Sequence, residues 1–572
     1  MVGPLAVLAM MIGLLAQSTP ASAAPLTIAG TVYDTANTTP LQGVCVTVGV
    51  PGSFCWATTA ADGSFFINMD QYSASPGGQW DLYFIKSGFS TAYFGKFVLS
   101  SPYRTPPIVM QKSGPAAAGN CTAVAAPTQT TYLPNITRTL GGPLGWDTPF
   151  FVQNAGSSTT AVEASFYYFD TGALATCHRT ATLAAGASLM EDPNAGSGLT
   201  DNKQYSVVVR SYGSPIFAAV NQTQLSNGRI EALSYSGFAT GATKVYVPNV
   251  TRRFFGYDIP LIIQNIGTST AFVTANFKSF DGTQNVNIPL TIGVGLSGVI
   301  DPDFTSGLVD QTQYAVTVTS NQAVAVVANA HNEAIGHLAY SHNGLAAGAP
   351  TVYGPWATKS TATFSNVVVQ NLGTAAATAT LTFKPTSGAT AQVFTTPSIP
   401  AGSASAFDVR FTNGIAIPNT ALCGSVASAT CLGDGDYALT VTSAQPVAAV
   451  VLPNSNTLAG AYVALAAPTT KALLPIAQRA FGGWSSSIWL QSISASTATL
   501  TFTPIGVGAA VPVTTSLVTG QTKKIDLVST AGLANGQQYS VVITGDGMLS
   551  AVVQESNPAP GDGLMVYEGF AQ

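Results

Sequence analysis

A spacing of four residues recurs four times along this chain and constrains its fold more than any other feature. In each copy a Gly is followed six positions later by Asp, then six positions later by a second Gly, and directly by Leu or Ile. The copies are Gly186/Asp192/Gly198-Leu199, Gly295/Asp301/Gly307-Leu308, Gly402/Asp408/Gly414-Ile415 and Gly520/Asp526/Gly532-Leu533. Because recurrence at a fixed period is the mark of a repeated structural unit, this Gly-Asp-Gly motif predicts an array of similar modules.

A second pattern marks where each unit begins. An aromatic residue or Leu is followed two positions later by Pro and six positions later by a basic residue, in the sets Tyr132/Pro134/Arg138, Tyr246/Pro248/Arg252, Tyr353/Pro355/Lys359 and Leu473/Pro475/Arg479. These starts are 114, 107 and 120 residues apart, close to the roughly 100 residues of one immunoglobulin-like sandwich. The predicted units are 132–240, 241–349, 350–468 and 469–572.

Within each unit the pattern is that of strands. Runs of period two end in Gln153-Asn154, Gln264-Asn265, Gln370-Asn371 or Gln491-Ser492, and a short turn and another alternating run follow. No stretch shows a helical period, and 56 Gly and 34 Pro are hard to place in long helices. The sequence therefore predicts an all-β chain of tandem β-sandwiches.

A Tyr follows each Gly-Asp-Gly motif and opens a Tyr-x-Val-x-Val type of strand, at Tyr205, Tyr314, Tyr437 and Tyr539. This resembles the tyrosine corner of immunoglobulin-like folds, in which the hydroxyl bonds back to the backbone a few residues upstream. In the third unit a sixteen-residue insertion separates the motif from Tyr437. The Q-N-x-G turns, with Gly156, Gly267 and Gly373, resemble those of CARDB-type and other immunoglobulin-like adhesion modules of prokaryotic surface proteins.

The region 24–112 lacks the repeat and reads as short alternating strands. Its matching residues are Ile28, Gly30 and Val32, then Gly43-Val44, then Ala61-Asp62-Gly63-Ser64-Phe65, then Tyr83-Phe84 with Lys86 and Gly88-Phe89. They resemble the carboxypeptidase regulatory-like, or transthyretin-like, module. The resemblance implies a small seven-stranded β-sandwich without peptidase activity, and no His begins an HxxE zinc motif. A linker rich in Ala, Gly, Pro and Thr is predicted over 113–131.

The N-terminus predicts export. The apolar run Leu5–Leu15 and the Ala21-Ser22-Ala23 site indicate a signal peptide over 1–23, with an uncleaved anchor as the alternative because the first residues carry no Lys or Arg. No second hydrophobic segment predicts a membrane span in the mature chain. Only 8% of residues are charged and the net charge is −5, so the composition excludes the basic patch that nucleic acid requires. A secreted or cell-surface location is expected.

Six cysteines suit that location. Cys45 and Cys55 flank a turn and are expected to bridge a hairpin. Cys423 and Cys431 fall inside the insertion of the third unit, where a disulfide would restrict a long loop. Cys121 and Cys177 then pair by elimination. A metal site is the alternative, since His178 adjoins Cys177, but no CxxC is present.

Few other residues point to chemistry. The motif aspartates Asp192, Asp301, Asp408 and Asp526 and the basic residues Arg138, Arg252, Lys359 and Arg479 predict structural ion pairs, or turn-capping aspartates with the basic side chain facing the next unit. Calcium at unit junctions is the alternative; otherwise no metal or cofactor is predicted. His331, Glu333, His337 and His342 could supply zinc ligands, but their spacing favours a surface hairpin. No G-x-S-x-G, Walker or HExxH motif occurs, and no enzyme is predicted.

Aromatic residues near the first turn of three units, including Trp146 and Trp484, either close the sandwich or stack on sugars. The third unit carries Trp356 earlier and no aromatic at that turn. The expected function is therefore a non-catalytic array for spacing, adhesion or matrix assembly, with an extracellular protein or polysaccharide surface as partner. The alternative is an accessory carbohydrate-binding protein. The insertion around Cys423 and Cys431 is the first place to look for a binding loop.

Overall fold

The computed structural model describes residues 25–34, 39–48, 55–72, 78–86, 89, 92–99, 102–105, 107–110, 126–142, 144–195, 198–226, 228–332, 337–416 and 421–572. The expected signal peptide, Cys121 and Glu333 lie outside these residues. The described chain is all-β, as predicted: its only helices are three short 3₁₀ turns, η1 (Met69–Tyr72), η2 (Pro302–Phe304) and η3 (Thr412–Gly414). None of the helices in these described ranges is long and apolar enough to cross a membrane.

The N-terminal module is a sandwich of two sheets. The first joins β1 (Thr27–Tyr33), β4 (Ser64–Asn68), β7 (Tyr103–Arg104) and β8 (Ile108–Val109), and the second joins β2 (Cys45–Val48), β3 (Ala57–Thr58), β5 (Gly78–Ile85) and β6 (Ala92–Leu99). The core includes the buried Ile28, Val46 and Phe84. The described residues of this module form eight strands, where the resemblance implied seven. The short strands β7 and β8 both pair in parallel with β1, at Ile28 and Val32.

Unit 1 shows the plan of the repeat, two four-stranded sheets facing each other. One sheet has the order β12-β11-β14-β9 and the other β13-β10-β15-β16. The strands are β9 (Gln129–Arg138), β10 (Phe150–Asn154), β11 (Thr160–Tyr168), β12 (Leu174–Leu183), β13 (Ser188–Glu191), β14 (Lys203–Tyr212), β15 (Ile216–Ser226) and β16 (Arg229–Ser236). Strand β9 begins inside the stretch predicted as linker, because Gln129 and Thr131 pair with β14.

Units 2 to 4 differ from unit 1 in one element. A single long strand corresponds to β14 and β15: β22 (Thr312–Asn332), β29 (Gly435–Asn454) and β36 (Gln537–Ser556) each pair with strands of both sheets. In unit 1 the corresponding path is interrupted between Tyr212 and Ile216, where Gly213 has a positive φ of 156°.

The remaining strands follow the same order as in unit 1. In unit 2 they are β17 (Ala242–Arg252), β18 (Leu261–Asn265), β19 (Ala271–Ser279), β20 (Asn285–Ile292), β21 (Ser297–Ile300) and β23 (Leu338–Asn343). In unit 3 they are β24 (Ala349–Lys359), β25 (Phe364–Asn371), β26 (Ala379–Pro385), β27 (Gln392–Thr395), β28 (Ala404–Asp408) and β30 (Tyr462–Val463). In unit 4 they are β31 (Thr469–Arg479), β32 (Ser485–Ser492), β33 (Thr497–Pro504), β34 (Val511–Ser516), β35 (Thr522–Asp526), β37 (Leu564–Glu568) and β38 (Phe570–Ala571).

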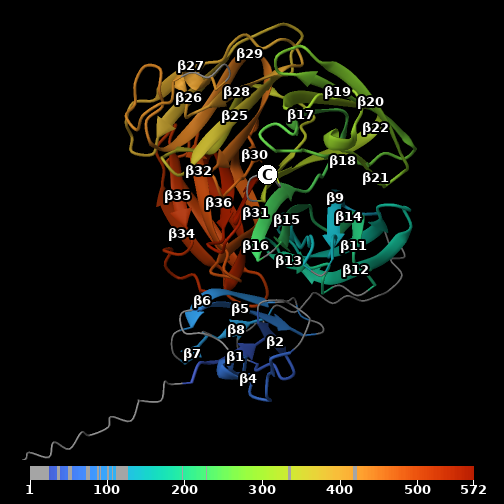
Figure 1. Ribbon diagram of the computed structural model, residues 1–572, viewed down its shortest axis with the longest axis vertical. Coiled ribbons are helices and arrows are strands. Elements are labelled where there is room, and N and C mark those ends of the chain that lie inside the picture. Colours follow the sequence, from blue (N-terminus) through green and yellow to red (C-terminus); the bar gives the residue numbers. More distant parts are fainter. Residues whose placement is uncertain are drawn as a thin grey trace, which may run out of the picture.

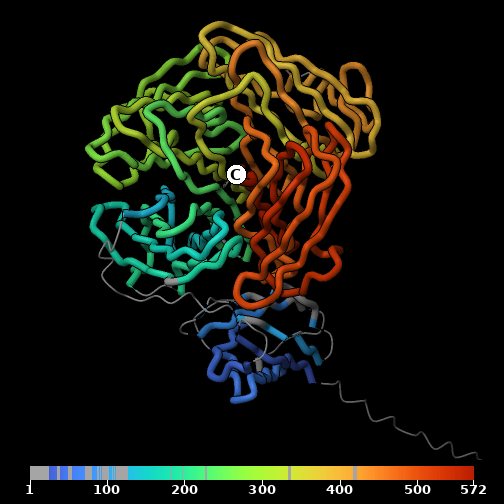
Figure 2. Tube along the Cα trace, turned by 180° about the vertical axis from the view of Figure 1, so that it is seen from behind, coloured from blue at the N-terminus to red at the C-terminus, as the bar shows by residue number. Residues whose placement is uncertain are grey.

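The four units form a closed ring, and the N-terminal module lies outside it (Figure 1). The last hairpin strands of the units, β16, β23, β30 and β37, each contact the next one around the centre, and β37 returns to β16. From behind, unit 4 again lies against both unit 3 and unit 1 (Figure 2). Because unit 4 meets unit 1, no repeat is left with a free end.

The joint between unit 4 and unit 1 uses the same contacts as joints between consecutive units. Gln370 Nε2 donates to Val316 O of unit 2 at 3.4 Å, and Gln491 Nε2 donates to Leu439 O of unit 3 at 3.1 Å. The equivalent Gln153 of unit 1 reaches unit 4, donating to Val541 O at 3.3 Å. These glutamines belong to the Gln-Asn motif. From the sequence, this motif was expected only to mark the end of a strand.

Apolar packing also continues around the ring. Val327 of unit 2 joins the core of unit 1, Val450 of unit 3 joins that of unit 2, and Val552 of unit 4 joins that of unit 3. Phe151 of unit 1 joins the core of unit 4. Residues 570–572 of unit 4 add contacts to unit 1 at this last joint. The Phe570 ring stacks on Phe217 at 4.8 Å between centroids, and Gln572 Nε2 donates to Ala155 O at 2.7 Å.

The recurring tyrosines make the expected backbone contacts. The Tyr205 hydroxyl donates to Thr200 O at 3.0 Å and accepts from Thr200 N at 2.8 Å. The same pair of bonds joins Tyr314 to Val309 and Tyr539 to Ala534. Tyr437 donates to Gly433 O at 2.7 Å, one residue nearer, after the insertion.

Candidate functional site

The Gly-Asp-Gly motif forms turns within each unit. Asp192, Asp301, Asp408 and Asp526 each accept, through Oδ1, the backbone N–H two residues ahead, at 2.9 to 3.0 Å. The motif glycines supply positive φ: Gly295 has a φ of 74° and Gly307 a φ of 90°. The motif therefore has a local structural role in every unit.

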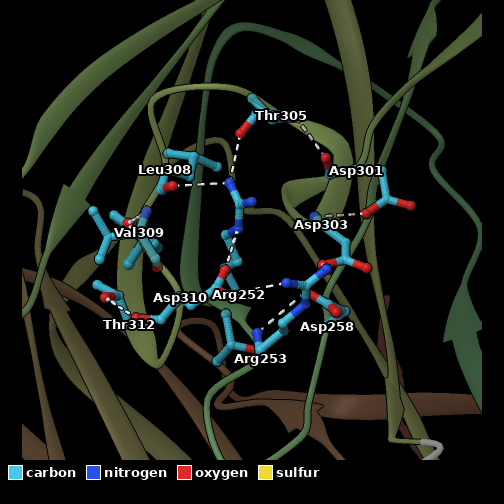
Figure 3. Close-up of polar contacts among 12 residues, drawn as sticks. Arg252, Arg253, Asp258, Asp301, Asp303, Thr305, Leu308, Val309, Asp310 and Thr312 are labelled. Atoms are coloured by element: carbon cyan, nitrogen blue, oxygen red, sulfur yellow. Dashed lines mark hydrogen bonds and ion pairs between the residues drawn. The ribbon is translucent and has the colours of Figure 1, made fainter.

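The basic residue at each unit start bonds to a loop of its own unit. Arg252 donates to Asp310 Oδ1 at 2.7 Å, to Thr305 O at 2.7 Å and to Leu308 O at 2.8 Å (Figure 3). Arg138 makes equivalent bonds to Asp201 and Pro193 O, and Arg479 to Asn535 and Thr530 O. The predicted orientation toward the neighbouring unit is wrong, because the loop before each tyrosine corner lies closer.

Two expected disulfides are confirmed, Cys45–Cys55 and Cys423–Cys431. Cys177 is also disulfide-bonded, and Cys121, its expected partner, lies outside the described residues. The Cys423–Cys431 loop is tied to unit 3 by Cys423 N, which donates to Arg410 O at 2.7 Å.

The hairpin predicted for the histidines of unit 2 forms between β22 and β23, but its predicted position on the surface is wrong. His342 is buried and His331 half-buried, and His342 Nε2 lies 3.0 Å from Asn249 O. His337 Nδ1 contacts Glu231 Oε1 of unit 1 at 2.7 Å. The hairpin is buried because β23 packs against β16 and β30 at the ring centre. Among the residues that the structure describes, no three or more His, Cys, Asp or Glu side chains are grouped to hold a metal ion.

Trp146 and Trp484 lie in contacts between units and do not form open platforms. The Trp146 ring meets His331 of unit 2 edge to face, with 5.2 Å between centroids. Trp484 packs against a cluster that joins Ile230 and Ala232 of unit 1 to Met565 of unit 4. Both side chains are half-buried, and the carbohydrate alternative therefore loses the exposed aromatics on which it was based.

These tryptophans identify a position that differs in unit 3. In units 1, 2 and 4 an aromatic residue closes the first turn: Trp146, Tyr257 and Trp484. The next residue in each unit pairs with the end of a long strand, β15 in unit 1, β22 in unit 2 and β36 in unit 4. Thr363 holds this position in unit 3, where it closes the turn from Ser360 and precedes Phe364, the partner of Asn454. Unit 3 thus has a small polar side chain where the other units have an aromatic ring.

A cleft of about 510 Å³ lies beside Thr363, at the junction of units 3 and 4. Unit 3 lines it with residues of β24, the first turn and the start and end of β29, and unit 4 lines it with residues of β32, β35, β36 and β37. This volume falls within the range of about 300–1,000 Å³ that is typical of small-molecule sites.

Two stacked indoles lie at the cleft. The rings of Trp356 of unit 3 and Trp489 of unit 4 are 5.4 Å apart and 12° from parallel. Trp356 Nε1 donates to Asp436 Oδ1 at 3.1 Å, and Trp489 Nε1 donates to Gln554 Oε1 at 3.0 Å. The Lys524 ammonium lies 5.3 Å from the centroid of Trp489, a cation–π distance.

Lys359 forms another part of the lining and shows why the insertion matters. Its ammonium donates to Asp434 Oδ1 and to Gly424 O, both at 2.7 Å, and its side chain is only 4% exposed. Asp434 and Gly424 belong to the insertion that carries the disulfide. The sequence pointed to Lys359 and to the insertion separately and did not predict their contact. Two signals set unit 3 apart in the sequence: Lys where the other units have Arg, and no aromatic residue at the first turn.

Buried carboxyl groups occupy the ring centre. Asp562 of unit 4 contacts all three other units: its N donates to Ile230 O at 2.6 Å, and its carboxylate accepts from Ala339 N at 2.8 Å and Ala459 N at 3.0 Å. Burial raises the pKa of Asp562 well above its usual range. Burial also raises the pKa of Glu555 to about 7, and Asn221 of unit 1 donates to this carboxylate at 2.6 Å.

No protein-family model matches the chain, and no curated protein sequence matches it. Among solved structures, the crystal structure of Thermotoga maritima 1070 is 16% identical with a TM-score of 0.17, covering 20% of this chain and 96% of that chain. The crystal structure of Streptomyces avermitilis alpha-L-rhamnosidase complexed with L-rhamnose is 10% identical with a TM-score of 0.10, covering 79% of this chain and 56% of that chain. With such low TM-scores, neither structure bears on the function of this chain.

Proposed function

We propose that this protein is a non-catalytic extracellular scaffold, in which a rigid ring of four sandwiches acts in adhesion or matrix assembly. The observation that carries the proposal is the joint between unit 4 and unit 1. Through this joint the loops and sheet edges of all four units keep fixed relative positions, which an open chain of modules would not provide. Fixed spacing allows several weak contacts to one surface to add up.

The disulfides support the extracellular part of the proposal. Cys45–Cys55 and Cys423–Cys431 each close a short loop, and such bonds persist in oxidising compartments outside the cytosol. A protein that only spaces other components would need no more than the ring. Adhesion also needs a partner surface, and we propose that this partner is an extracellular protein or polysaccharide.

The experiment compares the whole chain with a variant whose ring joint is weakened. Asn221→Ala with Phe570→Ala removes one hydrogen bond and one ring stack between units 1 and 4, while Gln284→Ala, an exchange on a loop of unit 2, serves as the control. We expect the wild type and the control to be recovered outside the cell and to be retained on immobilised matrix or cell-surface material, and the joint variant to be retained at least several-fold less. Recovery only from the cytosol, or equal retention of the joint variant, would contradict the proposal.

A further inference from the structure

The cleft between units 3 and 4 lies where unit 3 lacks the aromatic side chain that the other three units carry at the first turn. At the junction of units 1 and 2, Trp146 fills the turn position and packs against His331. At the cleft, Thr363 corresponds to Trp146 and Ser556 corresponds to His331. His331 lies near the end of β22 and Ser556 at the end of β36, and each is paired with the residue that follows the first turn of its own unit. Both Thr363 and Ser556 line the cleft.

The cleft is also held in shape before any ligand arrives. The disulfide closes the insertion, Asp434 N donates to Ser425 O at 2.8 Å, and the Asp434 carboxylate fixes the Lys359 ammonium. On the other side, Trp489 is fixed by its stack on Trp356 and its bond to Gln554. A preformed site loses less conformational entropy on binding.

The charges of the lining indicate the kind of ligand. Two lysines and two aspartates line the cleft, so their formal charges cancel. Lys359 is paired with Asp434, Asp436 accepts an indole N–H, and Lys524 lies by the Trp489 ring. Asp436 and Lys524 are thus opposite charges in the same lining, each without an ion pair among the described residues, and a ligand with a net charge would be attracted by one of them and repelled by the other.

The remaining lining groups provide both hydrogen-bond donors and acceptors. Asn454 and Gln554 carry amides, Ser360 and Thr363 carry hydroxyls, and Leu458 adds apolar surface. A ligand that fits must offer donors and acceptors on one small molecule together with some C–H surface. Neutral sugars have this chemistry, because each hydroxyl both donates and accepts.

We propose that the cleft between units 3 and 4 binds a short neutral oligosaccharide. This site differs from the turn tryptophans considered from the sequence: its binding groups lie around a recess between two units, and its apolar surface includes Leu458. The proposal adds a specific ligand site to the scaffold and does not require the scaffold to bind a matrix surface.

The test uses the full mature chain and titration calorimetry, after a screen against neutral oligosaccharides, uronic-acid oligosaccharides and dipeptides. Thr363→Trp places in unit 3 the side chain that units 1 and 4 carry, and we expect it to weaken binding of the best neutral oligosaccharide at least tenfold. Lys524→Ala should weaken binding several-fold. Lys523→Ala, on the adjacent exposed residue outside the lining, is the matched control and should leave the affinity unchanged.

Thermal unfolding of each variant separates loss of the site from loss of the fold, and Thr363→Ser provides a second variant that keeps the cleft open and should still bind. Absence of binding to every neutral oligosaccharide, a preference for the charged ligands, or undiminished binding by a folded Thr363→Trp protein would overturn the proposal. Matrix retention of the ring is measured separately, so either proposal can fail without the other.

Discussion

At the scale of single residues, the recurring Tyr hydroxyls have a defined structural role. Tyr314 is fully buried, and its hydroxyl accepts from Val309 N and donates to Val309 O. Both groups belong to a loop, so no strand partner replaces these bonds. Val309 itself is exposed, so each of these two bonds contributes about 0.5–1.5 kcal/mol to stability.

Tyr314→Phe should therefore lower the free energy of unfolding by about 1–3 kcal/mol, since the ring still fills the core but both Val309 groups lose their partner. Chemical denaturation measures the change. Tyr246→Phe, in the same unit, is the control, because its hydroxyl forms no hydrogen bond within the described residues and only its ring contacts Lys244. Equal effects of the two substitutions would show that the corner bond does not stabilise unit 2.

At the scale of elements, the insertion of unit 3 is an example of a loop stabilised from outside itself. Its few backbone bonds, such as Ser428 N to Cys431 O at 2.9 Å, lie within a segment with no strand of its own over residues 421–434. The disulfide, the Lys359 contacts and the bonds of the Gln392 side chain to Ser428 O, Cys431 O and Gly433 N tie it to the rest of unit 3. Their loss should affect this loop before it affects the sheets.

Cys423→Ser with Cys431→Ser should raise hydrogen exchange across residues 421–434, while β26 and β29 keep their protection. Loss of the cross-link should also cost about 2.5 kcal/mol, the loop-entropy value for so short a separation. The double serine variant at Cys45 and Cys55 is the control and should leave exchange in unit 3 unchanged. Unaltered exchange over 421–434 in the first variant would mean that the non-covalent contacts of Lys359 and Gln392 suffice.

At the scale of the whole molecule, ring closure removes the terminal repeats that an open array has. Each unit packs against two neighbours, and apolar cores continue across all four joints. In a linear array stability is a sum over nearest neighbours and the ends unfold most easily. A closed ring has no such end from which unfolding could begin.

The ring should therefore unfold in one cooperative transition, separate from that of the N-terminal module. Differential scanning calorimetry of the full chain should show at most two transitions. The Asn221→Ala, Phe570→Ala variant should broaden or split the ring transition, because it opens one joint. Four resolved transitions in the wild type would contradict the closed ring.

Ring stability should also depend on pH. Burial raises the pKa of Glu555 in the folded ring to about 7, from its ordinary value of 4.5. The folded ring consequently binds more protons than the unfolded chain between about pH 4.5 and 7, so stability is highest below this window and falls as the pH rises through it. The full loss from this group is up to about 3 kcal/mol.

Glu555→Gln should flatten this dependence between pH 5 and 8, as measured by denaturant unfolding at each pH. Asp562 and Glu568, whose pKa values burial also raises, contribute in the same direction and leave a residual slope. Glu568→Gln should thus reduce the slope as well. Rising stability from pH 5 to 8 in the wild type would show that these carboxyl groups are charged and well paired in the ring.

The sequence by itself determined the repeated unit, its all-β class, its tyrosine corners and two disulfides. These features depend on residues close in the chain: a turn needs Gly and Asp at a set spacing, and a corner needs Tyr a few residues after its loop. Their signals are therefore local and readable.

Only the tertiary structure decided that the units close into a ring, and where the cleft opens. Closure depends on contacts such as Asn221 with Glu555 and Phe217 with Phe570, which join residues more than three hundred positions apart. The missing aromatic at Thr363 was visible in the sequence, but its consequence depended on Ser556 of another unit. Sequence patterns report which surfaces are apolar, whereas packing decides which surfaces meet.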